Sequence, residues 1–438
     1  MKQKIKLGVV CLTRATFDVQ AARSIFENSK QKLRQIENVE WYFKEDSIFE
    51  VDEAEETAKE FAAAGVDGVV VISGTFHLGH LVLVIRKIVR QPLLLWAFGE
   101  LPYDGGKIRL NSVCGLNLNA SNLYKSGDDT FYTVTGDDID ADWIDAIRMK
   151  AAIQNAHIGI AGSRAHGFFN LGVDELRLMN ECGVITDYYP ISEMYGQQVS
   201  LEEVEAKKAE VCTLFNTSGL SQEQIDKVAA LTVSIKKFVH KYSLTGLAIR
   251  CWPEFAQQYG VSPCAAMSIL QSYGYILGCE GDVEGTLTML ACKAIGAETP
   301  FLADLSQVNF EEDFALMWHC GVAPCNLRDG KCIRSLDTYF AGGKGVTADF
   351  VMKAGRINIF RLDSARGKTR VYLAGGEALE MDKELKGTYA KVRFEKNIKE
   401  LLEQVAYTGV AHHVALVYGE FRKTFEIFAR LMQWEVIK

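Results

Sequence analysis

Apolar and polar residues alternate along the first two thirds of the chain in a pattern typical of an α/β protein. Short apolar runs, typical of buried parallel strands, are separated by longer segments in which apolar residues recur at helical spacing. This alternation predicts a doubly wound, Rossmann-like α/β domain over residues 1–155 and a second α/β domain over residues 156–315. We expect strands at Ile5–Leu12, Val39–Phe43, Asp67–Ser73 and Pro92–Ala97, and helices near Thr16–Gln35, Asp52–Ala64 and Leu81–Val89.

Beyond about residue 315 the pattern changes to that of an antiparallel sheet. Tyr389–Phe394 alternates charged and apolar residues, which gives a strand with one wet face and one dry face. Arg356–Leu362 and Thr369–Leu373 flank a turn-like segment, and the chain closes with the strand His413–Tyr418 and the helix Phe421–Met432. The sequence therefore predicts a mainly antiparallel β domain over residues 316–438.

Composition and charge narrow the class of protein. A length of 438 residues suggests two to three domains, and a net charge of −8 argues against nucleic acid or an anionic membrane as partner. The longest apolar stretch, Leu81–Phe98, is interrupted by Arg86, Lys87 and Arg90, so it does not predict a membrane span. The N-terminus leads into a strand without a signal-peptide core, and the 11 cysteines lie mostly in apolar runs. We therefore expect a cytoplasmic protein with buried, reduced thiols.

Two carboxylates end the strands of a predicted strand–helix–strand unit. The apolar runs Tyr275–Cys279 and Pro300–Ala303 flank the helical segment Val283–Ile295, and they are followed by Glu280 and Asp304. If both strands belong to one parallel sheet, the two carboxylates face the same crevice. They could then share a divalent cation or flank a reacting carbon. Alternatively, each carboxylate only caps the element that follows it.

Two neighbouring features favour the chemical interpretation. Asp282 stands where the helix begins and is a natural N-cap, which leaves Glu280 without a structural role. On that basis we expect Asp282→Asn to be mild, because Asn caps a helix about as well as Asp. His412 and His413 open the run Val414–Tyr418, and two adjacent histidines at the start of a strand are hard to explain by packing.

These segments resemble the metal-dependent L-fucose isomerase and L-arabinose isomerase superfamily. The likeness lies in C-E-G-D around Glu280, F-L-A-D ending at Asp304 and A-H-H-V-A-L-V-Y-G from Ala411, and the similarity to fucose isomerases covers most of the chain in order. The resemblance implies a metal site formed by Glu280, Asp304 and His413, whereas His412 affects sugar affinity. Carboxylate oxygens with one imidazole suit Mn²⁺, and Mg²⁺ or Co²⁺ is also possible.

The resemblance further implies an aldose–ketose isomerase that acts on a sugar through an ene-diol, with Glu280 and Asp304 as candidate acid and base. Family members form rings of identical subunits, so a homo-oligomer, a hexamer or a trimer, is expected. Two other interpretations remain open. The chain could be a sugar-binding protein or sensor without turnover, or a metal-dependent sugar epimerase or aldolase.

Other residues are candidates for sugar contacts. Arg250, Trp252 and Glu254 follow a predicted strand and could fix and stack a sugar, although Trp252 could instead pack in the core and Glu254 begin a helix. The resemblance places Phe76 and His77 where a neighbouring subunit's pocket is completed, although the histidine could equally be solvated at a helix start. Arg14 is a similar candidate.

Two further motifs have weaker signals. The turn Gly162–Gly167 follows a strand and could cradle a phosphate on backbone N–H groups, but a plain strand-to-helix turn is the simpler interpretation. The resemblance implies that this turn borders the sugar pocket. His319 and Cys320 with Cys325 and Cys332 suggest zinc, but their spacings lack the paired cysteines of structural zinc sites. Scattered buried thiols are the simpler interpretation.

Overall fold

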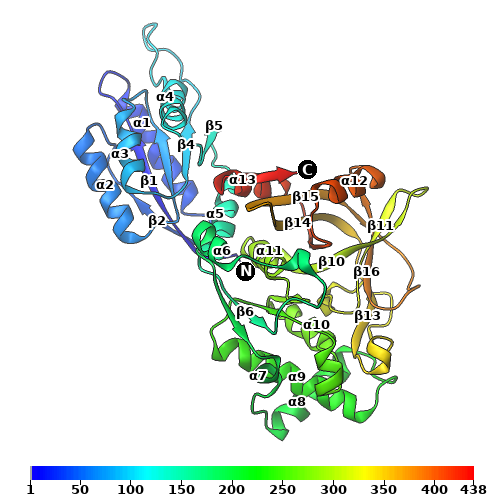
Figure 1. Ribbon diagram of the computed structural model, residues 1–438. Helices are drawn as coiled ribbons and strands as arrows, with labels where there is room; N and C mark the ends of the chain where they lie inside the picture. Colours follow the sequence, from blue (N-terminus) through cyan, green and yellow to red (C-terminus); the bar gives the residue numbers. More distant parts are fainter. Residues whose placement is uncertain (1) are drawn as a thin grey trace. The chain divides into compact units, whose positions relative to one another are not determined.

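The computed structural model describes residues 2–438 and divides them into two compact units. The first unit holds residues 2–151 together with Lys423–Glu435, and the second holds Ala152–Arg422 together with Val436–Lys438. Figure 1 follows the chain through both units from blue to red. The three-domain division expected from the sequence stays a prediction. No helix in the described residues is long and apolar enough to cross a membrane.

The first unit contains a five-stranded parallel sheet in the order β2-β1-β3-β4-β5, which confirms the predicted doubly wound fold. The apolar runs of β1, β3 and β4 are buried on both faces because helices cover the sheet, whereas the edge strands β2 and β5 are only partly buried. Sequence reasoning did not anticipate α4 and β5. The elements are β1 (Ile5–Leu12), β2 (Val39–Phe43), β3 (Gly68–Ser73), β4 (Leu93–Ala97), β5 (Phe131–Thr135), α1 (Val19–Leu33), α2 (Val51–Ala64), α3 (His80–Ile88), α4 (Ser112–Lys125) and α5 (Ala141–Gln154).

The helix α13 (Arg422–Leu431), near the end of the chain, packs within the first unit rather than with the strands that precede it. The Thr424 hydroxyl donates to Asp142 Oδ1 at 2.5 Å, and Lys423 Nζ lies 2.7 Å from Asp140 Oδ2. The chain then ends in β18 (Glu435–Ile437), which pairs with β15 of the second unit.

The second unit begins with a four-stranded parallel sheet in the order β7-β6-β8-β9. This sheet confirms the second α/β region predicted from the sequence, and the carboxyl ends of its strands lie beside the candidate site. Its elements are β6 (His157–Ala161), β7 (Ile185–Tyr189), β8 (Gly246–Ile249), β9 (Leu277–Cys279), α6 (Glu175–Cys182), α7 (Ile191–Tyr195), α8 (Leu201–Leu214), α9 (Gln222–Lys241), α10 (Cys264–Ser272) and α11 (Val283–Ala294).

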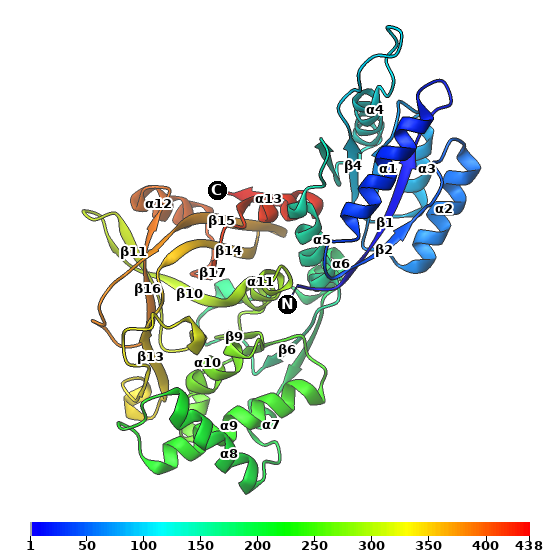
Figure 2. The ribbon, with the colours of Figure 1, turned by 180° about the vertical axis from the view of Figure 1, so that it is seen from behind.

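A nine-stranded, mostly antiparallel sheet forms the rest of the second unit, as the sequence predicts for its C-terminal part. An additional pairing of β15 with β16 closes six of its strands, β16-β11-β10-β17-β14-β15, into a barrel. In Figure 2 these strands gather in the yellow-to-red part of the chain. The elements are β10 (Glu298–Asn309), β11 (Phe314–His319), β12 (Ser335–Asp337), β13 (Thr347–Val351), β14 (Gly355–Ala365), β15 (Lys368–Leu379), β16 (Thr388–Phe394), β17 (His413–Tyr418) and α12 (Ile398–Thr408).

One strand prediction is wrong. The run Pro300–Ala303 belongs to β10, which pairs antiparallel with β11 and β17, and not to the parallel sheet that contains β9. Asp304 therefore lies inside a strand rather than at its end. The register places Asp304 directly opposite His413 on β17, so the barrel itself brings a carboxylate and an imidazole together.

Candidate metal centre and active site

Glu280 is held in a tight turn immediately after β9. Its backbone is left-handed, with φ of 62°, a conformation that a residue with a Cβ adopts only at some cost in energy. Gly281 follows with φ of 74°, and a Cβ there would collide with the backbone of Ser163 and Arg164. The Ala165 N–H donates to the Glu280 carbonyl at 2.8 Å. The close approach of these two loops fixes the direction of the Glu280 side chain.

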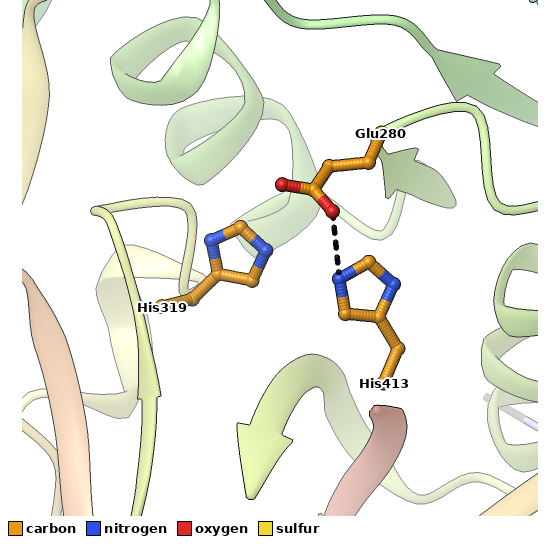
Figure 3. Close-up of side chains that lie close together, drawn as sticks. All are labelled: Glu280, His319 and His413. Carbon is orange, nitrogen blue, oxygen red and sulfur yellow. Dashed lines mark ion pairs between the residues drawn. The ribbon is translucent and has the colours of Figure 1, made fainter. Parts of the chain in front are cut away.

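Four side chains from different elements converge on one point in the second unit. His413 Nε2 lies 3.3 Å from Glu280 Oε2 and 3.5 Å from Asp304 Oδ1. His319, the last residue of β11, places its ring centroid 5.6 Å from that of His413. Figure 3 shows the side chains of Glu280, His319 and His413 pointing toward one another.

The atoms that face this point are buried and have no hydrogen-bond partner. They are Glu280 Oε2, Asp304 Oδ1, His319 Nε2 and His413 Nε2. Each buried polar atom without a hydrogen-bond partner costs about 1–3 kcal/mol, so four directed at one point fit a bound group that contacts all of them. The potential ligand atoms of Glu280, His319 and His413 lie within 4.8 Å of one another, as do those of Asp304, His412 and His413. Two carboxylates with imidazoles fit a divalent cation.

Asp282 does more than cap a helix, contrary to the expectation from the sequence. It accepts the Gly285 N–H at 2.8 Å as the N-cap of α11, and it also accepts from His413 Nδ1 at 2.9 Å. The fully buried guanidinium of Arg361 donates from Nη1 to the same oxygen of Asp282, Oδ2, at 2.7 Å. Because Nδ1 of His413 is bonded to Asp282, Nε2 is left to face Glu280 and Asp304.

The charges around His413 shift its pKa and that of its neighbours. Burial opposes protonation of His413, but the carboxylates of Asp282 and Glu280 outweigh it and raise the pKa to about 10. Burial acts against ionisation of Glu280, yet its contacts with His412 and His413 hold the pKa of Glu280 well below its usual value. Burial lowers the pKa of His319, which is therefore neutral and able to act as a ligand.

Several residues expected to contact a sugar lie beside this cluster. Trp252 Nε1 donates to Glu280 Oε1 at 3.4 Å. The Phe168 ring packs edge-on against Trp252 and His412, with centroid distances of 5.9 and 5.2 Å. His412 stands just before β17, which begins at His413. Strand geometry therefore does not force its side chain to the face opposite that of His413, and its Nε2 lies 3.6 Å from Glu280 Oε2. The aromatic rings give the cluster an apolar wall on which a sugar face could stack.

Arg250 and Glu254 form an ion pair beside the same turn. Arg250 Nη2 lies 2.5 Å from Glu254 Oε1, and Nη1 donates to the Ser163 hydroxyl at 3.3 Å. The Nε of Arg250 is buried and has no hydrogen-bond partner. Their expected contact with a sugar stays a prediction.

The candidates in the first unit have local partners of their own. Arg14 is exposed directly after β1, and Phe76 is half-buried. His77 is wholly buried rather than solvated, with Nε2 3.1 Å from Asn119 Nδ2, and burial lowers its pKa to about 4. The role of these three residues in a neighbouring subunit's pocket stays a prediction.

The zinc interpretation has no support in the structure. All 11 cysteines are free thiols. In residues 2–438, the groups with metal-binding spacing contain carboxylates and histidines but no cysteine. His319 belongs to the carboxylate cluster, and Cys320 lies 3.8 Å from Cys264 through their sulfur atoms.

Two family models match the chain over separate regions. The N-terminal domain of the fucose and sulfoquinovose isomerases matches residues 8–144, and the C-terminal domain of L-fucose isomerase matches residues 319–438. Together they take in more than half of the chain. The chain belongs to the fucose/sulfoquinovose isomerase family. It is an aldose–ketose isomerase.

Relatives of this isomerase match it along nearly their whole length. The sulfoquinovose isomerase of Priestia aryabhattai is 27% identical over 441 residues, which cover 97% of each chain. That of Alkalicoccus urumqiensis is 25% identical over 390 residues, covering 85% of this chain and 86% of the relative. A periplasmic sugar-binding protein from Legionella pneumophila covers 60% of this chain and 75% of its own at 8% identity, but its TM-score of 0.17 carries no structural argument.

Two members of the candidate site are missed by the sequence analysis. His319 is grouped there with nearby cysteines, although it ends the apolar run Phe314–His319, where an imidazole has no evident packing role. Arg361 gives no signal, because β14 also holds Arg356 and Asp363, and the role of Arg361 emerges only when its buried partner Asp282 is known.

Proposed function

We propose that the chain is a divalent-metal-dependent isomerase that interconverts an aldose and a ketose through an ene-diol. Glu280, Asp304 and His413 serve as metal ligands, and His319 serves as a fourth. The observation that supports this assignment is the set of four buried, unpartnered atoms directed at one point. Mn²⁺ suits the mixed oxygen and imidazole donors, with Mg²⁺ and Co²⁺ as alternatives.

When bound, the cation supplies Lewis-acid polarisation to the carbonyl and hydroxyl oxygens of the sugar. The carboxylates of Glu280 and Asp304 approach from the end of β9 and from β10. One takes the proton of the hydroxyl-bearing carbon and returns it to the former carbonyl carbon, while the other carries the hydroxyl proton to the carbonyl oxygen, so both are ionised again after turnover. Trp252 orients Glu280 through its indole N–H, and the adjacent rings exclude water from one side of the sugar. His413 is held by Asp282 throughout.

The relatives indicate the class of sugar. Two matches over most of the chain are to sulfoquinovose isomerases, and sulfoquinovose is a glucose that carries a sulfonate in place of its terminal hydroxyl. We take a sulfonated aldohexose as the proposed substrate. L-Fucose and L-arabinose are the alternatives that the wider family suggests.

The test is a set of aldoses offered to the purified protein in the presence of Mn²⁺. Sulfoquinovose, L-fucose, L-arabinose and D-glucose are incubated separately, and products are identified by NMR. We expect a ketose from at least one sugar, loss of activity after EDTA treatment and its return with Mn²⁺. Activity that survives complete metal removal contradicts the proposal, as does binding without turnover. An epimeric aldose as the only product supports the epimerase alternative.

Metal content distinguishes the two adjacent histidines. His413 is fully buried between Asp282 and Glu280, whereas the His412 side chain is 38% exposed and bonded to Asn170. We therefore expect His413→Ala to lose tightly bound Mn²⁺, and His412→Ala to keep the metal and to alter mainly the KM for the sugar. Metal analysis of both purified variants, with circular dichroism as a check of folding, measures this. Metal lost from His412→Ala and retained in His413→Ala would reverse the two assignments.

A further inference from the structure

A cavity of about 410 Å³ opens at the carboxyl ends of β6, β7 and β8, within the second unit. The turn after β6 and the start of α11 line it, and Arg164 and Arg250 supply its charged side chains. His166 and the Ser163 hydroxyl add further polar groups, and no carboxylate is among the lining residues. The cavity therefore presents positive charge to any molecule that enters it.

The two arginines differ in whether a carboxylate already neutralises their charge. Arg250 is bound on one edge by Glu254, but its buried Nε has no partner. Arg164 has no carboxylate within 4.0 Å among residues 2–438; its guanidinium lies over the Phe169 ring at 4.4 Å and donates to the Ala165 carbonyl at 3.4 Å. A guanidinium without a counter-charge at a cavity wall is suited to an oxyanion with several acceptor oxygens.

The cavity and the carboxylate cluster share a wall. Gly281 lines the cavity and directly follows Glu280, and the Ala165 N–H, beside Arg164, donates to the Glu280 carbonyl at 2.8 Å. The two features therefore meet at the Glu280–Gly281 turn, and an anionic group on a sugar held at the cluster must pass this turn to reach the two arginines. In open α/β sheets, ligands bind beyond the carboxyl ends of the strands, which is where the cavity and Glu280 lie.

We propose that this cavity is an anion subsite in which Arg164 and Arg250 bind the sulfonate group of the sugar substrate. The proposal rests on the function proposed above and assigns the part of the site that selects a sulfonated sugar over a neutral one. It also gives a role to the turn Gly162–Gly167, whose Ser163, Arg164 and His166 lie on the cavity wall.

The experiment compares Arg164→Gln and Arg164→Lys with the unaltered protein, using sulfoquinovose and its neutral counterpart D-glucose. Arg164→Gln is expected to raise the KM for sulfoquinovose about tenfold or more, with kcat and the kinetics on D-glucose little changed. Arg164→Lys keeps the charge but not the planar pair of donors, so it should recover part of the loss. The control is Arg393→Gln, which removes the same charge from an exposed position of β16. It should leave the kinetics on both sugars unchanged.

A binding measurement separates failure of the subsite from failure of the proposed function. Calorimetric titration with the alditol of sulfoquinovose, which has no carbonyl to isomerise, should show affinity that D-glucitol lacks and that Arg164→Gln loses. Equal binding of both alditols overturns the subsite even if the protein isomerises an aldose. Sulfonate-dependent binding without ketose from any aldose supports the subsite and overturns the isomerase assignment. Arg164-dependent binding of inorganic sulfate, without binding of the sulfonated alditol, assigns the cavity to free anions and overturns the proposal.

Discussion

Replacing Glu280 with Gln, or Asp304 with Asn, is expected to abolish isomerisation while leaving the fold intact. Each change preserves the shape of the side chain and removes one negative charge from the cluster around His413 Nε2. In the proposed mechanism, each change removes an anionic metal ligand and a group that moves a proton of the sugar. General acid–base catalysis alone contributes about a hundredfold or more, so activity should fall at least that far.

The measurement is the rate of ketose formation at saturating Mn²⁺, with bound metal determined on the same samples. Glu377→Gln is the matched control, because Glu377 is exposed on β15 and its loss leaves the cluster untouched. If either variant keeps more than a few per cent of the activity, the carboxylate that it replaces has no part in the proposed mechanism. Unchanged circular dichroism is needed to assign the loss to chemistry.

Asp282→Asn should be severe, not mild as its position before a helix suggests. Asn keeps an oxygen that caps α11, but it removes the charge that balances the fully buried Arg361 and weakens the acceptor for His413 Nδ1. Breaking a buried ion pair typically costs about 3–5 kcal/mol, and loss of a partner that orients a metal ligand costs about 10–100-fold in metal affinity.

The free energy of unfolding and the affinity for Mn²⁺ measure these two effects separately. Asp174 provides the control, because it caps α6 through the Arg177 N–H at 3.0 Å and is exposed. Asp174→Asn should therefore change the free energy of unfolding by less than about 0.5 kcal/mol. If the two variants behave alike, Asp282 acts only as a helix cap and does not orient His413.

The prediction of the fold succeeds where it depends on the hydrophobic pattern of neighbouring residues. It fails where a strand pairs with another that is distant in the sequence. Periodicity gave most helices and strands close to their observed bounds, because burial of one face or of both faces leaves a mark on neighbouring residues. Pro300–Ala303 is equally apolar whether it lies in a parallel sheet or in a barrel wall. Its partner β17 lies far along the chain, so the run itself holds no information about which sheet it joins.

The site shows the same division between local and distant information. Glu280 and the histidine pair stand out at the ends of apolar runs, where a charged or imidazole side chain has no packing role. The second role of Asp282 depends on Arg361, 79 residues away, and on His413, 131 residues away, so no spacing rule reaches it. A resemblance to a family identifies the proposed metal ligands. The side chains that orient those ligands are found only in the folded structure.

Under the catalytic role proposed for Glu280, its left-handed backbone sets thermal stability against catalysis at a single position. A glutamate with φ of 62° gives up about 1–3 kcal/mol that glycine would not, and its buried, unpartnered oxygen adds to the deficit. Laboratory evolution for heat resistance, without a screen for turnover, would therefore favour Gly or Asn at this position and yield a more durable but inactive protein. Attempts to raise thermal stability should keep Glu280 unchanged and introduce substitutions elsewhere in the chain.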